Sequence, residues 1–165
     1  MNEATKQFFL QLYLESELDG SEYVDWAFTC LEEGFDSKSL RLLAGFSRDH
    51  PYKADFEELF RQSLNELDWG YLTDKEVLLN YAKGLAKQIL SGEIESAEAV
   101  EKIYGIYGQL GFPAELEAWS LFYEGHSTEW YERSRWIPFM QKYNHEKWLE
   151  AVKREAKDLI EADFS

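Results

Sequence analysis

Cysteine is almost absent from this sequence. The single cysteine among 165 residues, Cys30, cannot form an internal disulfide. A chain of this length can bury a sizeable core without cross-links, and a lone thiol is typical of a reducing compartment. The first ten residues lack the basic start and long apolar stretch of a secretory signal. No stretch approaches the roughly 20 apolar residues of a membrane span. We therefore expect a cytoplasmic location.

Motifs that bind metals or cofactors are also missing. The three histidines, His50, His126 and His145, are far apart, and the sequence has no HExxH, ExxH or paired CxxC motif. It also has no glycine-rich phosphate loop, nucleophile elbow or dinucleotide fingerprint. Cys30 follows Tyr23 and Ala27 on one helical stripe, which predicts a buried, inert thiol. We expect no catalytic residue, no metal and no cofactor. The alternative is an enzyme site assembled from dispersed carboxylates and a histidine.

Basic charge is scarce as well. Residues 1–70 hold 15 acidic and 6 basic side chains, a balance of −9, out of a net charge of −15 for the chain. Residues 71–125 contribute −5 and residues 126–165 only −1. Nucleic acids and anionic membranes need a positive protein surface. We therefore predict neither direct nucleic-acid binding nor membrane binding.

The apolar residues follow the spacing of α-helices throughout, and no segment alternates with a period of two. This pattern predicts an all-α single domain over residues 1–165. The short segments favour a compact bundle of seven or eight antiparallel helices, with a short irregular helical-repeat stack as the alternative. Helix starts are expected at Ser21, at Asp36 and Ser37, at the capping box Thr73–Glu76, and at Pro113.

Glycines are expected to end most of these helices in the left-handed conformation. The candidates are Gly20, Gly34, Gly45, Gly70, Gly92, Gly111 and Gly125. Three others, Gly84, Gly105 and Gly108, fall inside helical segments, where glycine is costly. We expect a neighbouring helix to pack closely against them.

An acidic tract is the first candidate site. Between Gln7 and Ser37 there is no Lys, Arg or His, and eight carboxylates have no compensating charge nearby in the sequence. Such a tract is either an ordinary solvated surface or a docking surface that attracts a basic protein. Its members are Glu15, Glu17, Asp19, Glu22, Asp25, Glu32, Glu33 and Asp36.

An aromatic segment in the last third is the second candidate. Trp119, Phe122 and Trp148 fit helical stripes and are predicted to lie in the core. Other aromatic residues beside arginines fit no stripe, and such residues often anchor protein interfaces. This candidate interface consists of Trp130, Tyr131, Arg133, Arg135 and Trp136.

Two segments carry a resemblance to known proteins. "EYVDWAFTCLEEGFDSKSLRLLAG" (22–45) and "YAKGLAKQILSGEI" (81–94) resemble small all-helical bacterial proteins of unassigned function. The shared residues are caps and core positions over about a third of the chain, so the resemblance implies a fold and no catalytic residues. Some such acidic proteins are immunity proteins, which cover the active site of a toxin.

Two functional hypotheses follow. The first is a non-enzymatic acidic module that binds a basic protein, for example a toxin whose cleft holds nucleic acid. The second is a structural or self-associating scaffold, such as a homodimer, that uses the aromatic segment.

Overall fold

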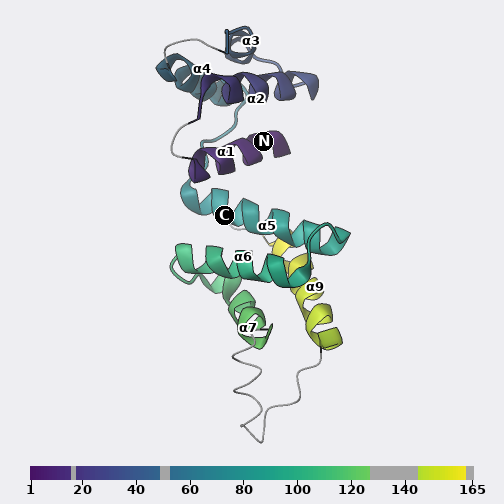
Figure 1. Ribbon diagram of the computed structural model, residues 1–165. Coiled ribbons are helices and arrows are strands. Elements are labelled where there is room, and N and C mark those ends of the chain that lie inside the picture. Colours follow the sequence, from purple (N-terminus) through teal and green to yellow (C-terminus); the bar gives the residue numbers. More distant parts are fainter. Residues whose placement is uncertain (16–17, 49–52, 127–144, 163–165) are drawn as a thin grey trace, which may run out of the picture. The chain divides into compact units, whose positions relative to one another are not determined.

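The computed structural model describes residues 1–15, 18–48, 53–126 and 145–162 (Figure 1). These residues form eight α-helices and one short 3-10 helix and contain no strand, which confirms the predicted all-α fold. The elements are α1 (Glu3–Leu14), α2 (Gly20–Glu32), α3 (Lys38–Ala44), α4 (Lys53–Glu66), α5 (Asp74–Ser91), α6 (Ser96–Gln109), η1 (Ala114–Leu116), α7 (Glu117–His126) and α9 (His145–Glu161).

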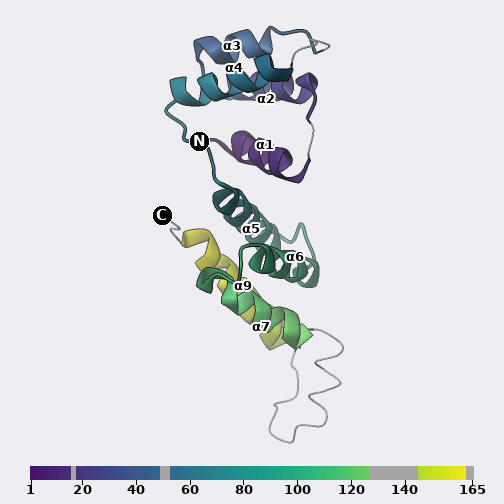
Figure 2. The same cartoon turned by 90° about the vertical axis from the view of Figure 1, so that its left-hand side faces the viewer.

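Contacts divide the chain into two compact units, the N-terminal unit Met1–Val77 and the C-terminal unit Leu78–Ser165. The expectation of one domain over residues 1–165 stays a prediction. Within the N-terminal unit, α2 and α4 lie between α1 and α3 (Figures 1 and 2).

Aromatic rings form the centre of the N-terminal unit. The Phe60 ring on α4 lies 5.1 Å from the ring of Phe8 on α1 and 4.7 Å from the ring of Trp26 on α2. Tyr23 lies 5.9 Å from Phe60 and 5.1 Å from Phe8, and all four side chains are buried. Edge-to-face pairs of this kind add to the stabilisation from burial alone. They fix the position of α1 against α2, which matters for the groove described below.

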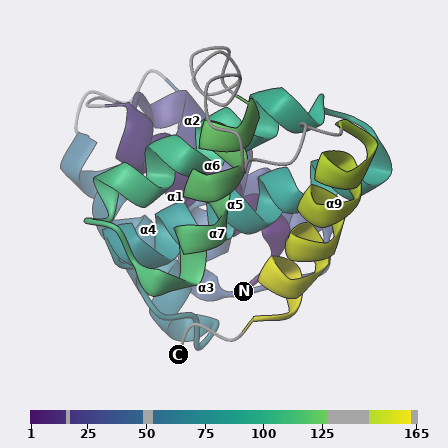
Figure 3. The same cartoon turned by 90° about the horizontal axis from the view of Figure 1, so that it is seen from below.

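The core of the C-terminal unit comes from α5, α6, η1, α7 and α9. In this unit α6 and α7 lie side by side (Figure 3). Trp119 and Trp148 are buried and Phe122 packs against the same cluster, as predicted. The indole Nε1 of Trp148 donates a hydrogen bond to the backbone oxygen of Phe122 at 3.1 Å, which joins α9 to α7.

Several predicted helix boundaries are confirmed. The Leu40 backbone N–H donates to the Ser37 hydroxyl at 3.2 Å, so Ser37 caps α3. Thr73 and Glu76 form a reciprocal capping box, with hydrogen bonds of 2.7 and 3.3 Å. Three of the glycines predicted to end helices have positive φ, namely Gly34, Gly92 and Gly111.

Other boundary predictions are wrong. Gly45 ends α3 in the right-handed region, and Gly125 lies inside α7. Gly20 is the first residue of α2, where a Cβ atom would overlap the ring of Phe56. Asp19, two residues before Ser21, is the N-cap of α2. A helix does start at Pro113, but this proline is the N-cap of the 3-10 helix η1 and not a residue of its first turn.

The predicted close packing at the interior helix glycines is also wrong. Within the described part of the chain, a Cβ atom at Gly84, Gly105 or Gly108 would meet no atom within 4 Å. No described helix packs closely against these three glycines. Close packing therefore does not explain why glycine, a poor helix former, stands at these positions.

Candidate functional site

Helices α1 and α2 form an antiparallel hairpin, as their contacts show. Near the start of α1, the Asn2 amide and the Thr5 hydroxyl approach the Cys30 sulfur near the end of α2. At the other end, Gln11 Nε2 donates to Glu22 Oε1 at 2.6 Å. Because early residues of one helix meet late residues of the other, the helices run in opposite directions. This is the expected arrangement for helices joined by a short loop.

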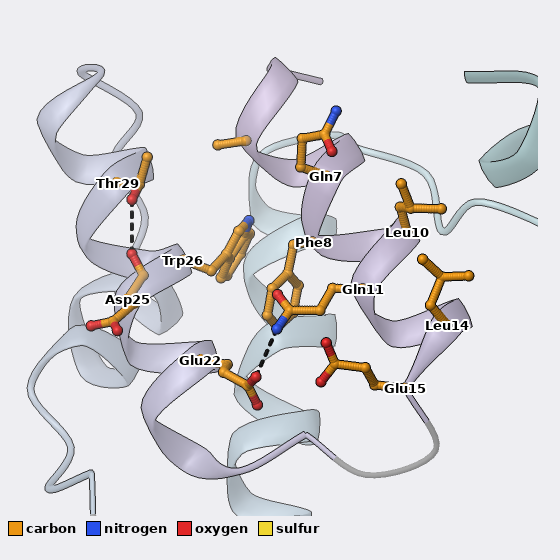
Figure 4. A pocket seen from close by; sticks show the side chains of 11 residues that line it. Gln7, Phe8, Leu10, Gln11, Leu14, Glu15, Glu22, Asp25, Trp26 and Thr29 are labelled. Atoms are coloured by element: carbon orange, nitrogen blue, oxygen red, sulfur yellow. Dashed lines mark hydrogen bonds between the residues drawn. The ribbon is translucent and has the colours of Figure 1, made fainter. Parts of the chain in front are cut away.

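A groove of about 560 Å³ lies between these helices (Figure 4). This volume falls in the range of about 300–1,000 Å³ typical of ligand-binding clefts. Its lining residues recur at helical spacing on both helices, so each helix contributes one stripe. We call this feature the α1–α2 groove; it is lined by Ala4, Gln7, Phe8, Leu10, Gln11, Leu14 and Glu15 of α1 and its C-cap, and by Glu22, Asp25, Trp26 and Thr29 of α2.

Apolar side chains form much of the α1–α2 groove. Phe8 and Trp26 project between the two helices (Figure 4), and they are only 5% and 4% exposed. Leu14, by contrast, is 65% exposed near the hairpin loop. An exposed leucine beside aromatic rings offers apolar surface that a partner could remove from water.

Carboxylates give the α1–α2 groove a negative charge at one end. Glu15 follows α1 directly and Glu22 lies in the first turn of α2, so both are next to the hairpin loop. Asp25 lies about one turn further along α2. None of the described residues that line the groove is Lys, Arg or His. At the opposite end the lining residues Ala4, Gln7 and Thr29 are uncharged.

Local hydrogen bonds hold the acidic end in place. Glu22 Oε2 accepts from the backbone N–H of Asp19 at 2.7 Å, while Oε1 accepts from Gln11. Asp19 Oδ1 accepts from the backbone N–H of Ser21 at 2.8 Å. Hydrogen bonds from the hydroxyl and backbone N–H of Ser21 lower the pKa of the Asp19 carboxyl. The capping box therefore keeps both side chains ordered as acceptors.

The carboxylates of the acidic tract differ in their partners, and among the described ones Asp19, Glu32, Glu33 and Asp36 do not line the groove. Asp36 forms an ion pair with Arg41 at 3.0 Å, and Glu33 accepts a hydrogen bond from Asn2 Nδ2 at 2.5 Å. Asp19 and Glu22 act as capping residues, and Asp25 pairs with Arg48. Arginines beyond the tract thus neutralise part of its charge. Among the described residues, Glu15 and Glu32 have no side-chain hydrogen bond or ion pair.

Some predicted site residues cannot be placed. Glu17 and the whole candidate aromatic interface (Trp130, Tyr131, Arg133, Arg135 and Trp136) lie outside the described residues. Cys30 is fully buried as predicted, and its burial raises the pKa of the thiol. In residues 1–15, 18–48, 53–126 and 145–162, no group of three His, Cys, Asp or Glu side chains could hold a metal ion. No helix in the same ranges combines the length and apolar character needed to cross a membrane.

Eight of the eleven groove residues were not candidates from sequence, namely Ala4, Gln7, Phe8, Leu10, Gln11, Leu14, Trp26 and Thr29. Their spacing of three and four positions was visible, but that spacing equally describes an ordinary core stripe. Comparison with protein-family models, curated proteins and solved structures finds no match to this chain. The resemblance to small bacterial immunity proteins therefore stays a prediction.

Proposed function

We propose that this chain is a non-enzymatic protein-binding module whose N-terminal unit binds a basic protein. The observation that supports the proposal is the α1–α2 groove, in which apolar side chains lie beside Glu15, Glu22 and Asp25. An apolar centre with charged groups around it is the usual composition of a protein interface. The carboxylates of Glu15 and Glu22, which pair with no basic side chain among the described residues, would attract a positive partner and speed the encounter.

The biological role consistent with this surface is inhibition of a toxin by covering its active site. A toxin that acts on nucleic acid needs a basic cleft to hold phosphates, and an acidic protein can occupy that cleft in place of the nucleic acid. This role extends the resemblance to bacterial immunity proteins and is a proposal at the level of protein class.

The test compares a groove variant with a charge-matched control. Glu15→Gln/Glu22→Gln/Asp25→Asn removes three negative charges from the α1–α2 groove. Glu93→Gln/Glu101→Gln/Glu150→Gln removes three from exposed positions in the C-terminal unit. The partner is first captured from a lysate of the source organism at low salt and identified by mass spectrometry. Association rates of the purified partner are then measured by surface plasmon resonance.

We expect the groove variant to associate about tenfold more slowly than the wild type at low salt, because steering by nearby charges is lost. The control should stay within about twofold, and added salt should slow the wild type steeply. Equal association rates for the two variants would remove the α1–α2 groove from the proposal.

A further inference from the structure

We infer that the segment of the partner bound in the α1–α2 groove is an amphipathic helix with Lys or Arg concentrated toward one end. This inference rests on the proposed function and specifies the chemistry of the ligand. It follows from the shape of the groove, from the order of its side chains and from the charges still available there.

The shape of the groove favours a helix over an extended peptide. Both walls are α-helices whose backbone groups bond within each helix, so no sheet edge is available to pair with a strand. The lining side chains repeat every three or four residues on α1 and on α2. Rows of side chains with this spacing accommodate the ridges of another helix. An occupying helix would use apolar residues at i, i+3, i+4 and i+7.

The order of side chains along the groove sets a direction. Leu14, Glu15 and Glu22 lie near the hairpin loop, whereas Gln7 and Thr29 lie toward the far end (Figure 4). Basic side chains of the occupant are therefore needed at the loop end, and uncharged ones at the far end. A helix with basic residues along its whole length would place some of them beside the uncharged lining residues Gln7 and Thr29.

The available charges identify the strongest anchor. Glu15 is exposed, and its carboxylate has no hydrogen bond or ion pair with another described residue, so a partner cation need not displace one. The two Glu22 oxygens accept from Asp19 and Gln11, and each keeps further lone-pair capacity for a Lys or Arg. Asp25 already pairs with Arg48, but both side chains are more than half exposed, and such a pair contributes little.

The experiment uses three synthetic peptides of equal length. The first is an amphipathic helix of leucine, alanine and lysine with its lysines toward one end. The second has the same composition in an order that gives no apolar face, and the third replaces lysine by glutamate. Binding to the full chain is measured by isothermal titration calorimetry, and the contact surface is mapped by amide NMR shifts.

Single variants separate the apolar from the charged contribution. Leu14→Ser is compared with Leu121→Ser, because these leucines are almost equally exposed at 65% and 64% and belong to different units. Glu15→Gln is compared with Glu93→Gln. We expect Leu14→Ser and Glu15→Gln each to lower the affinity for the amphipathic lysine peptide by about threefold to tenfold. Each control should change the affinity by less than about twofold.

The outcomes distinguish the two proposals. Three results together would support the helical ligand. The amphipathic lysine peptide binds more tightly than the other two, its binding shifts the amide signals of α1 and α2, and both Leu14→Ser and Glu15→Gln weaken that binding. If both lysine peptides bind equally, and Glu15→Gln but not Leu14→Ser weakens their binding, the inference of a helical ligand is wrong. The proposed function is then still supported. No binding of either lysine peptide, or equal binding of the glutamate peptide, would contradict both.

Discussion

Trp26 on α2 donates a hydrogen bond from its indole Nε1 to the Thr5 hydroxyl on α1 at 3.0 Å. Thr5 is fully buried, and its own hydroxyl donates to Asn2 Oδ1, the N-cap acceptor of α1. A single chain of hydrogen bonds therefore runs from the start of α1 to the middle of α2. It sets the register of the hairpin, and with it the position of the α1–α2 groove.

Replacing Thr5 by valine tests this link. Thr5→Val keeps the shape of the side chain but leaves the buried Trp26 N–H without its acceptor, so we expect a loss of about 1–3 kcal/mol in the free energy of unfolding. Urea denaturation followed by circular dichroism measures it. The control is Thr29→Val, the same change at an exposed site on α2, with an expected effect within about 0.5 kcal/mol. Equal losses for the two variants would contradict the role of the Thr5 hydroxyl.

Two glycines of the C-terminal unit should respond to alanine with opposite signs. Gly105 lies inside α6 with open space around its missing Cβ, so Gly105→Ala should stabilise the fold by about 0.5–1 kcal/mol. Gly92 has φ of +78°, so Gly92→Ala should destabilise it by about 1–2 kcal/mol. Thermal denaturation compares the two. Destabilisation by Gly105→Ala would mean that another part of the chain packs on this face.

Glu66 should make the stability of the N-terminal unit depend on pH. Its carboxylate accepts from the Ser39 backbone N–H and hydroxyl, both at 2.8 Å. These bonds lower the pKa of Glu66 in the folded state. The contribution of Glu66 to the free energy of unfolding is therefore complete above the ordinary glutamate pKa of about 4.3. It is lost as the pH falls through the lower pKa of the folded state.

The variant Glu66→Gln gives the readout for this pH effect. It should melt at a lower temperature than the wild type at neutral pH, and the difference should narrow as the pH falls through the lowered pKa of Glu66, because the wild-type carboxyl then protonates. Melting temperatures at a series of pH values test this. A constant difference across the whole range would show that Glu66 acts through packing instead of charge.

Local features were predictable because they depend on neighbouring residues. The capping hydroxyl of Ser37, the Thr73–Glu76 box and the left-handed Gly34 each involve groups within a few positions of one another. The helical stripes also predicted that Cys30 is buried, because burying one face is what makes an amphipathic helix stable. These signals were sufficient to assign the fold class.

Errors arose where a distant residue decides the local structure. Gly20 follows an apolar run as a helix-ending glycine would, yet it begins α2 beside the ring of Phe56, 36 positions away. Gly105 is costly in a helix and suggested a close neighbour, but none of the described residues fills that space. Periodicity reports which face of a helix is apolar, and it does not report which element covers that face.

Composition and short-range pattern thus determined an acidic, all-helical chain and the positions of many helix ends. Only the tertiary structure selected Glu15, Glu22 and Asp25 from eight candidate carboxylates and placed them in one groove with Phe8, Leu14 and Trp26. It also paired Asp25 with Arg48, which lies outside the acidic tract. Local hydrogen bonding and helix periodicity act over a few residues. The groove and its charge depend instead on the register of the α1–α2 hairpin, which buried contacts between distant residues establish.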